Sequence, residues 1–223
     1  SGGLVGIGIT NPSSLLHVQN NSVTETKIVI ESTGTNSYPA FRVKNDAKAY
    51  DLGIDGATDA FRIYDVTGTA ERLRITSDGK ILIGDDTAEA TMGLIPNIQT
   101  FGTDAGTSSI AIRRGSNDAQ AAFLVMSKSR NTSVGSRTIL QNGDEVGNIF
   151  FVADDGTDLA SNTAAIKSQI DGVVGVNSTP GNLTFWTTSG NANAATERLR
   201  IASNGNITVN SGNASNNATI ILS

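Results

Sequence analysis

The chain has 223 residues, of which 38% are apolar, 5% aromatic and 17% charged. Its net charge of −5, with the 16 basic residues scattered, argues against nucleic-acid binding, which needs clustered Lys and Arg. No apolar run approaches the roughly 20 residues that span a bilayer, and the absence of cysteine excludes disulfides and thiolate chemistry. Large aromatic side chains are scarce, so a single chain would have a weak core, and burial against other chains is a natural remedy.

Short runs of alternating apolar and polar residues follow one another along the chain. Clusters of Gly, Asn, Asp and Ser separate them, which is the pattern of many short β-strands joined by tight turns. Helical periodicity is nearly absent: residues 159–170, with Ala-rich spacing, are the one candidate for a short helix, and no heptad run supports a coiled coil. The predicted strands include residues 5–9, 15–18, 41–43, 61–64, 110–112, 123–126, 148–152 and 183–186.

An internal repeat is the most informative feature. Residues 71–79 read Glu-Arg-Leu-Arg-Ile-Thr-Ser-Asp-Gly, and residues 197–205, which lie 126 positions later, read Glu-Arg-Leu-Arg-Ile-Ala-Ser-Asn-Gly. Seven of the nine positions are identical, and an alternating apolar run follows each copy. The signature residues are Glu71, Arg72, Leu73, Arg74, Ile75 and Gly79 in the first copy and Glu197, Arg198, Leu199, Arg200, Ile201 and Gly205 in the second.

Each copy predicts a β-hairpin. In the first copy Leu73 lies between Arg72 and Arg74, so one face of the strand is apolar and the other is charged. An Asp-Gly pair in one copy and an Asn-Gly pair in the other are favoured two-residue turns, because both central residues must adopt positive φ. The expected features are superimposable hairpins over residues 71–83 and 197–209, positive φ at Gly79 and Gly205, and Leu73 and Leu199 facing the core.

The repeat also divides the chain into modules. Residues 5–9 match the strand after the turn, so the chain start resembles the end of such a unit. Residues 218–222 resemble residues 26–30, as if another unit were opening. The spacing exceeds the roughly 20 to 50 residues of solenoid repeats, so each unit is a small multi-stranded module. The predicted division is a shorter module over residues 1–84, a longer one over 85–210 and the start of a truncated third over 211–223.

Several short motifs accompany the repeat. They are Val5-Gly6-Ile7-Gly8, Asn11-Pro12-Ser13-Ser14, Leu16-His17-Val18, Ser127-Lys128-Ser129-Arg130, Val134-Gly135, Gln141-Asn142-Gly143-Asp144, Gly147, Ala153-Asp154-Asp155-Gly156-Thr157-Asp158, Pro180-Gly181-Asn182-Leu183 leading into Phe185, and Thr196-Glu197-Arg198-Leu199-Arg200-Ile201 with Ser203-Asn204-Gly205. Together they resemble a signature common in phage tail-fibre proteins, which also occurs in some bacterial surface proteins. The resemblance implies a trimeric fibre, frequently ending in a self-cleaving chaperone domain of the endosialidase type; no such domain is recognisable in this sequence.

Three groups of aspartates are candidates for catalysis or calcium binding, because some phage spikes hydrolyse polysaccharide with paired acids. Each group lies beside Gly and Thr in a turn context, where Asp is favoured because it bonds its own backbone, and this structural interpretation is preferred. None has the oxygen-ligand spacing of a calcium hand. The groups are Asp85 and Asp86; Asp154, Asp155 and Asp158; and Asp51, Asp55 and Asp59.

The other candidates are also interpreted as structural. His17 is the only histidine and lies in a strand motif, which disfavours a Ser-His-Asp triad; with no cysteine, a catalytic zinc site is excluded. The repeated Glu and Arg residues either bind a glycan or carboxylate or, as we prefer, pair with acids between strands or subunits. Trp186 and Phe185 form either a sugar-stacking platform with the tyrosines or, preferably, part of the core. The tyrosines are Tyr38, Tyr50 and Tyr64, and the sequons at Asn182, Asn206 and Asn217 carry little weight for a bacterial host.

The sequence therefore predicts an all-β fold of short antiparallel strand modules strung along a fibre axis, in an intertwined homotrimer. No catalytic residue, cofactor or metal ligand is predicted. The expected function is structural and adhesive: a segment of a phage tail fibre that extends the virion tail and supports attachment to a glycan or protein of the host surface. Two alternatives stay open, namely a bacterial or prophage-derived surface adhesin and a tailspike that depolymerises polysaccharide.

Overall fold

The computed structural model describes residues 3–20, 27–190, 192 and 194–210. These residues form thirteen β-strands and no helix, which confirms the predicted all-β class. The chain divides into two compact units: unit 1 comprises Ser1–Thr87 and Ile98–Gly102, and unit 2 comprises Ala88–Asn97 and Thr103–Ser223. The predicted third module, residues 211–223, lies outside the described residues, and the module limits at 84 and 210 stay predictions.

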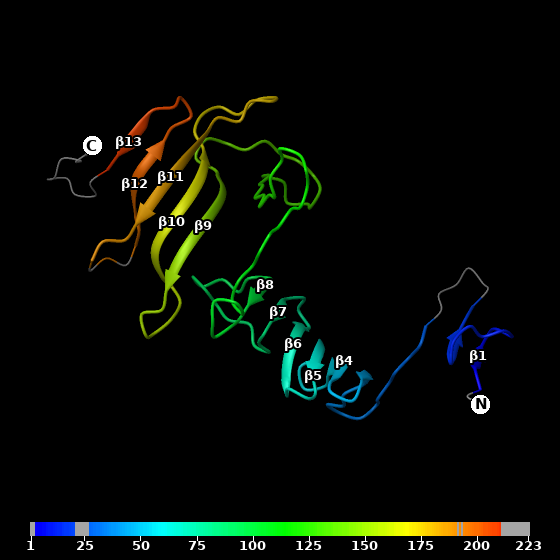
Figure 1. Cartoon of the computed structure of the whole chain (residues 1–223). Helices are drawn as coiled ribbons and strands as arrows, with labels where there is room; N and C mark the ends of the chain where they lie inside the picture. Colours follow the sequence, from blue (N-terminus) through cyan, green and yellow to red (C-terminus); the bar gives the residue numbers. More distant parts are fainter. Residues whose placement is uncertain (1–2, 21–26, 191, 193, 211–223) are drawn as a thin grey trace. The chain divides into compact units, whose positions relative to one another are not determined.

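Unit 1 contains a two-stranded ribbon and a six-stranded sheet (Figure 1). In the ribbon two strands pair in parallel, and in the sheet the strands follow chain order, antiparallel as far as β7, with β8 parallel to β7. The ribbon strands are β1 (Val5–Ile7) and β2 (Leu16–Val18); the sheet strands are β3 (Ala40–Lys44), β4 (Ala49–Asp55), β5 (Ala60–Asp65), β6 (Ala70–Ile75), β7 (Ile81–Ile83) and β8 (Ile98–Thr100).

Unit 2 contains one antiparallel sheet in the order β13-β12-β11-β10-β9 (Figure 1). The helix considered for residues 159–170 does not form. Residues 161–170 form the interior strand β10, whose backbone pairs with a neighbour on each side, and this pairing overrides the helix propensity of its alanines. The strands are β9 (Glu145–Ala153), β10 (Ser161–Ile170), β11 (Gly181–Thr187), β12 (Thr196–Ile201) and β13 (Ile207–Val209).

Two of the predicted strands are not strands in the single chain. Residues 110–112 and 123–126 lie in segments without regular secondary structure, over 109–116 and 120–129. Within the part of the chain that the structure describes, no backbone–backbone hydrogen bond involves either segment. Alternating apolar and polar residues identify a segment that can form a β-strand. A strand also needs a neighbouring strand to pair with, and the described part of the single chain supplies none for these two segments.

The two repeated hairpins are present as β6–β7 and β12–β13. Gly79 and Gly205 have φ values of 88° and 84°, as expected. The turn, however, is not the two-residue type that was predicted, because Asp78 and Asn204 do not have positive φ. The amide of Gly79 donates to the carbonyl of Thr76 and the amide of Thr76 to that of Lys80, which makes a three-residue loop. Such loops combine a type I turn with one left-handed glycine.

Candidate functional site

Each sheet has one face made almost entirely of apolar side chains. Residues directly opposite one another in paired strands point to the same side, so the registers assign every strand residue to a face. The apolar face of unit 1 consists of Phe41, Val43, Tyr50, Leu52, Ile54, Phe61, Ile63, Leu73, Ile75, Ile81, Ile83 and Ile98. The apolar face of unit 2 consists of Ile149, Phe151, Ile166, Leu183, Phe185, Leu199, Ile201, Ile207 and Val209.

Much of both apolar faces is exposed in the single chain. Phe41, Ile98 and Ile207 are 58%, 62% and 68% exposed. Among the described residues, the buried apolar side chains are only Ala60, Leu82, Ala165 and Ile170. A single chain therefore has almost no core of its own, and its apolar faces are suited to burial against other surfaces.

The opposite face of unit 1 carries a buried ionic cluster around Arg74, which is 3% exposed. The guanidinium donates from Nε to Oε2 of Glu71 at 2.8 Å, from Nη2 to Oδ2 of Asp55 at 2.9 Å and from Nη1 to Oγ1 of Thr58 at 2.7 Å. Burial lowers the pKa of Arg74, but Glu71 and Asp55 raise it more, so the net shift is upward. Burial likewise raises the pKa of Asp55, and the hydrogen bonds from Thr58 and Arg74 bring it below its usual value.

Arg62 extends this cluster toward the tyrosines. Its Nη1 donates to Glu71 at 3.1 Å, and its guanidinium lies over the rings of Tyr38 and Tyr64 at 5.4 and 4.8 Å from their centroids. These are cation–π distances, so both rings already have a partner. Tyr50 lies on the apolar face, and the three tyrosines therefore do not form one sugar-stacking platform.

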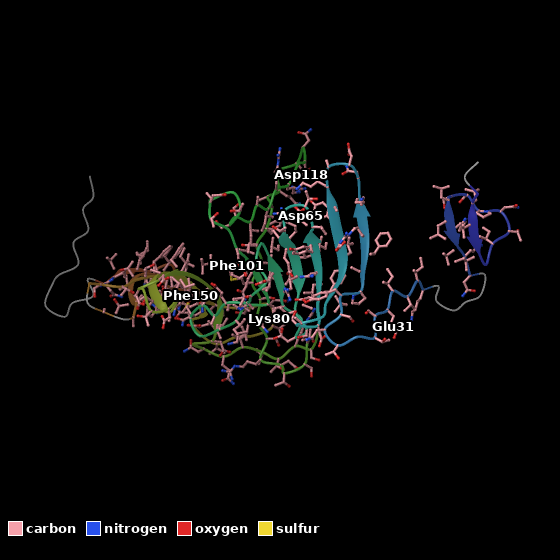
Figure 2. All side chains as sticks on the ribbon, turned by 90° about the horizontal axis from the view of Figure 1, so that it is seen from below. Glu31, Asp65, Lys80, Phe101, Asp118 and Phe150 are labelled. Atoms are coloured by element: carbon pink, nitrogen blue, oxygen red, sulfur yellow. The ribbon has the colours of Figure 1, made fainter. Side chains whose placement is uncertain are left out.

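The charged face of unit 2 repeats part of this arrangement. Arg200 donates from Nε and Nη2 to the two carboxylate oxygens of Glu197 at 3.0 and 2.6 Å. Lys167 places its ammonium 4.5 Å from the ring centroid of Trp186 and 5.4 Å from that of Phe150. Phe185 lies on the other face, because adjacent strand residues alternate, so the two rings do not form the sugar-stacking platform that was the less favoured alternative. Phe150 (Figure 2), which sequence reasoning missed, is the aromatic neighbour on this face.

A second ion-pair site lies at the end of β5. The fully buried carboxylate of Asp65 accepts hydrogen bonds from Nη2 of Arg72 at 2.6 Å, the amide of Gly68 at 2.8 Å and Nζ of Lys48 at 3.3 Å. The hydrogen bond from Arg72, with that from Gly68, holds the pKa of Asp65 well below its usual range against the opposing effect of burial. Asp65 and Lys80 mark opposite ends of the strands in this sheet (Figure 2). Arginine pairing with acids, which we preferred for the repeats, thus occurs within the chain.

The recognised motif over residues 127–144 is also held by an ion pair. Asp144 accepts from Nε and Nη2 of Arg130 at 2.6 and 2.8 Å and from the amide of Gln141 at 2.8 Å. Lys128 adds its ammonium at 3.7 Å. The hydrogen bond from Arg130 is the largest cause of the strongly lowered pKa of Asp144. This pairing explains why charged residues stand at these positions of the motif.

The aspartate candidates lie mainly in turns. Asp154 accepts from the amide of Gly156 at 2.7 Å, and Asp155 from the amide of Thr157 at 2.9 Å. That backbone hydrogen bond is the largest cause of the lowered pKa of Asp155. Asp158 bonds the amide of Ala160. Asp59 has a φ of 56°, a value that turns tolerate. Of the third group, Asp51 pairs with Arg42 at 2.6 Å, and Asp55 belongs to the Arg74 cluster.

The structure brings some candidates together and separates others. Asp85 and Asp86 line an open polar hollow with Arg62, Tyr64 and Glu71. In a search limited to the described residues, no group of three or more His, Cys, Asp or Glu residues is placed to hold a metal ion. No helix among those residues is long and apolar enough to cross a membrane.

The remaining predicted positions are structural or fall outside the described residues. His17 lies in β2, and its Nδ1 accepts from the amide of Ser13 at 3.2 Å. Asn182 is buried, and the amide of Asn206 donates to the side chain of Asn204 in the second hairpin turn. Asn217 lies outside the described residues.

Comparison with known proteins identifies solved structures that share this fold. No protein-family model matches the chain, and no curated protein matches it in sequence. The carboxy-terminal domain of the bacteriophage T5 L-shaped tail fibre matches with a TM-score of 0.64 and 14% sequence identity, over 92% of each chain. The chain has the fold of a phage tail-fibre domain. A second structure, the T5 domain with its intra-molecular chaperone domain, matches with a TM-score of 0.65 and 15% identity, over 92% of this chain and 68% of that one.

These matches confirm the tail-fibre resemblance predicted from the sequence motifs. At 14 to 15% identity they establish the fold and leave individual residue roles to the contacts described above.

Proposed function

We propose that this chain is a structural, non-enzymatic segment of a phage tail fibre and assembles as a homotrimer. The proposal rests mainly on the exposed apolar face of each sheet. In this assembly three copies bury their apolar faces against one another and leave the charged faces outward. The fold shared with the T5 tail fibre supports the fibre assignment, and the repeated modules, 1–84 and 85–210, follow one another along the fibre axis.

The exposure of the apolar faces favours an assembly over a monomer. Phe41, Ile98 and Ile207 each expose more than half of their surface in the single chain, and obligate protein interfaces bury apolar surface of this kind. The low charge content fits as well, because the cores of obligate interfaces are depleted in charged residues.

The segment extends the virion tail and supports attachment to a host-surface glycan or protein. Stiffness in this role comes from paired backbone and buried area between chains, without a cofactor. Hydrolysis is disfavoured because the hydrogen bonds from turn amides or arginines lower the pKa of these aspartates. A general acid needs a raised pKa.

Light scattering on the purified chain tests the assembly. We expect a mass near three times 23.1 kDa at micromolar concentration, and a compact 23-kDa monomer would contradict the proposal. The variant Ile98→Asp places a charge on the apolar face and should shift the mass toward the monomer. The matched control Val134→Asp, at a fully exposed position in a turn, should leave the mass unchanged. Binding of the labelled trimer to host cells tests the attachment role.

A further inference from the structure

Two segments without regular secondary structure, residues 109–116 and 120–129, have the sequence character of strands but no strand partner. Arg114 donates to both carboxylate oxygens of Asp118 and to the carbonyl of Gln120, and these bonds fix the turn between the segments. At the far end the Arg130–Asp144 pair anchors the second segment. The segments are thus held in place at the turn between them and at the far end of the second segment. In the described part of the chain no backbone–backbone hydrogen bond joins them to each other or to any other segment.

Their side chains are apolar on both sides of the backbone. Residues 121–126 read Ala-Ala-Phe-Leu-Val-Met, an apolar run without charge or proline. In a strand Phe123 and Val125 point one way and Leu124 the other, so both faces need cover, as in strands buried within a sheet. Phe123, Leu124 and Val125 are 68%, 71% and 77% exposed in the single chain. Ile110 and Ile112 give the first segment one apolar face of the same kind.

An uncovered run of this composition is an aggregation hazard, because six-residue segments of high β-propensity and low charge stack readily with other strands. A stable protein must therefore cover it. Two of the three charged residues in these segments are paired within the chain, since Arg114 pairs with Asp118 and Lys128 lies near Asp144; among the described residues Arg113 has no ion pair. The exposed apolar faces of the two sheets give a second copy of this chain an equally apolar surface with which to cover the run.

We infer that residues 109–116 and 120–129 form β-strands by pairing with the backbone of a second copy of this chain. This inference rests on the proposed homotrimer and names the segments through which the chains intertwine. The missing hydrogen-bond partners of the two segments are then supplied between subunits, and their apolar side chains join the shared core.

Amide hydrogen exchange on the purified trimer tests the inference. We expect the amides of Ile112 and Val125 to exchange at least about 100-fold more slowly than that of Val134, because hydrogen-bonded amides in a stable strand are protected. A trimer in which both exchange at the rate of Val134 would overturn the inference and leave the proposed function standing. If the purified protein is a monomer, both the inference and the proposed homotrimer are wrong. Protection that appears only after host-cell extract is added would assign the segments to another partner and also overturn it.

Cysteine probes separate inter-chain from intra-chain contact, since the natural chain has no cysteine. Val125→Cys carrying a benzophenone maleimide should give crosslinked dimers and trimers on irradiation, at the mass expected for linked chains. The same label on Val134→Cys, a fully exposed position, should give few. Equal yields at both positions, or links only within one chain, would contradict inter-subunit pairing.

Discussion

Glu71 and Arg74 form a bidentate ion pair although they stand three residues apart in one β-strand. Residues at this spacing normally point to opposite faces of a sheet. The register between β5 and β6 shifts at this point: Ile63 pairs with Leu73, but Tyr64 pairs with Glu71, so Arg72 is an extra residue in a β-bulge. The bulge brings Glu71 onto the face of Arg74.

The second copy of the repeat has the same bulge. Phe185 pairs with Leu199 and Trp186 with Glu197, so Arg198 is the extra residue. Glu197 and Arg200 consequently form the same bidentate pair. The Glu-Arg-Leu-Arg signature is thus the sequence of a bulged strand that carries its own ion pair.

Removing the arginine of the buried pair should be costly. Arg74→Met leaves the buried carboxylate of Asp55 without its cation and Glu71 with Arg62 alone, and breaking a buried pair in this way costs about 3 kcal/mol or more. The matched change Arg200→Met, at a side chain that is 31% exposed, should cost about 1 kcal/mol. Denaturant unfolding at one fixed protein concentration measures both, and equal losses would contradict the role assigned to burial.

Stability should fall in acid. The pKa of Asp65 is lowered in the folded chain by its bonds to Arg72 and Gly68, and those of Asp55 and Asp144 are lowered as well. A group whose folded pKa lies below its unfolded value, about 3.9 for Asp, contributes stability above that value and loses it as the pH falls. Thermal unfolding should therefore show a constant Tm from pH 7 to 5 and a decreasing Tm below pH 4.

The variant Asp65→Asn isolates one of these groups. It should lower the Tm at pH 7, because Arg72 and Lys48 lose their anionic partner. Its Tm should then change less between pH 5 and pH 2 than that of the unsubstituted chain. An acid-induced decrease of the same size in both proteins would show that Asp65 does not contribute to it.

Local features of this fold were predictable from the sequence, and features that depend on pairing were not. Alternation located β5 and β11, and glycine located the turns at Gly79 and Gly205, because each signal lies within a few residues. The bulge at Arg72 was not visible, since it exists only relative to β5. The cation–π contacts of Lys167 with Phe150 and Trp186 were not visible either, because they depend on the register of three strands.

The turn glycines offer a direct test of the hairpins. Gly79→Val should destabilise the protein by about 1 to 3 kcal/mol, because a β-branched residue is strained at a φ of 88°. Gly205→Val, at the equivalent position, should have a similar effect. Gly34→Val is the control, since Gly34 has no positive φ and only one side-chain atom near the added Cβ. An unchanged Tm for Gly79→Val would show that the turn assignment is wrong.

The last prediction concerns hydrolysis. Acid catalysis on a glycan needs one carboxyl group that stays protonated near neutral pH, which burial in an apolar pocket usually provides. Asp155 and its neighbours instead bond turn amides at the surface, and the pKa of Asp155 is lowered. We therefore expect no release of reducing ends when the purified trimer is incubated with capsular polysaccharide or lipopolysaccharide from a susceptible host. The comparison variants are Asp154→Asn and Asp155→Asn, which remove the carboxylates that a catalytic groove between subunits would need. Release by the natural protein that either variant abolishes would identify a depolymerase and overturn the non-enzymatic proposal.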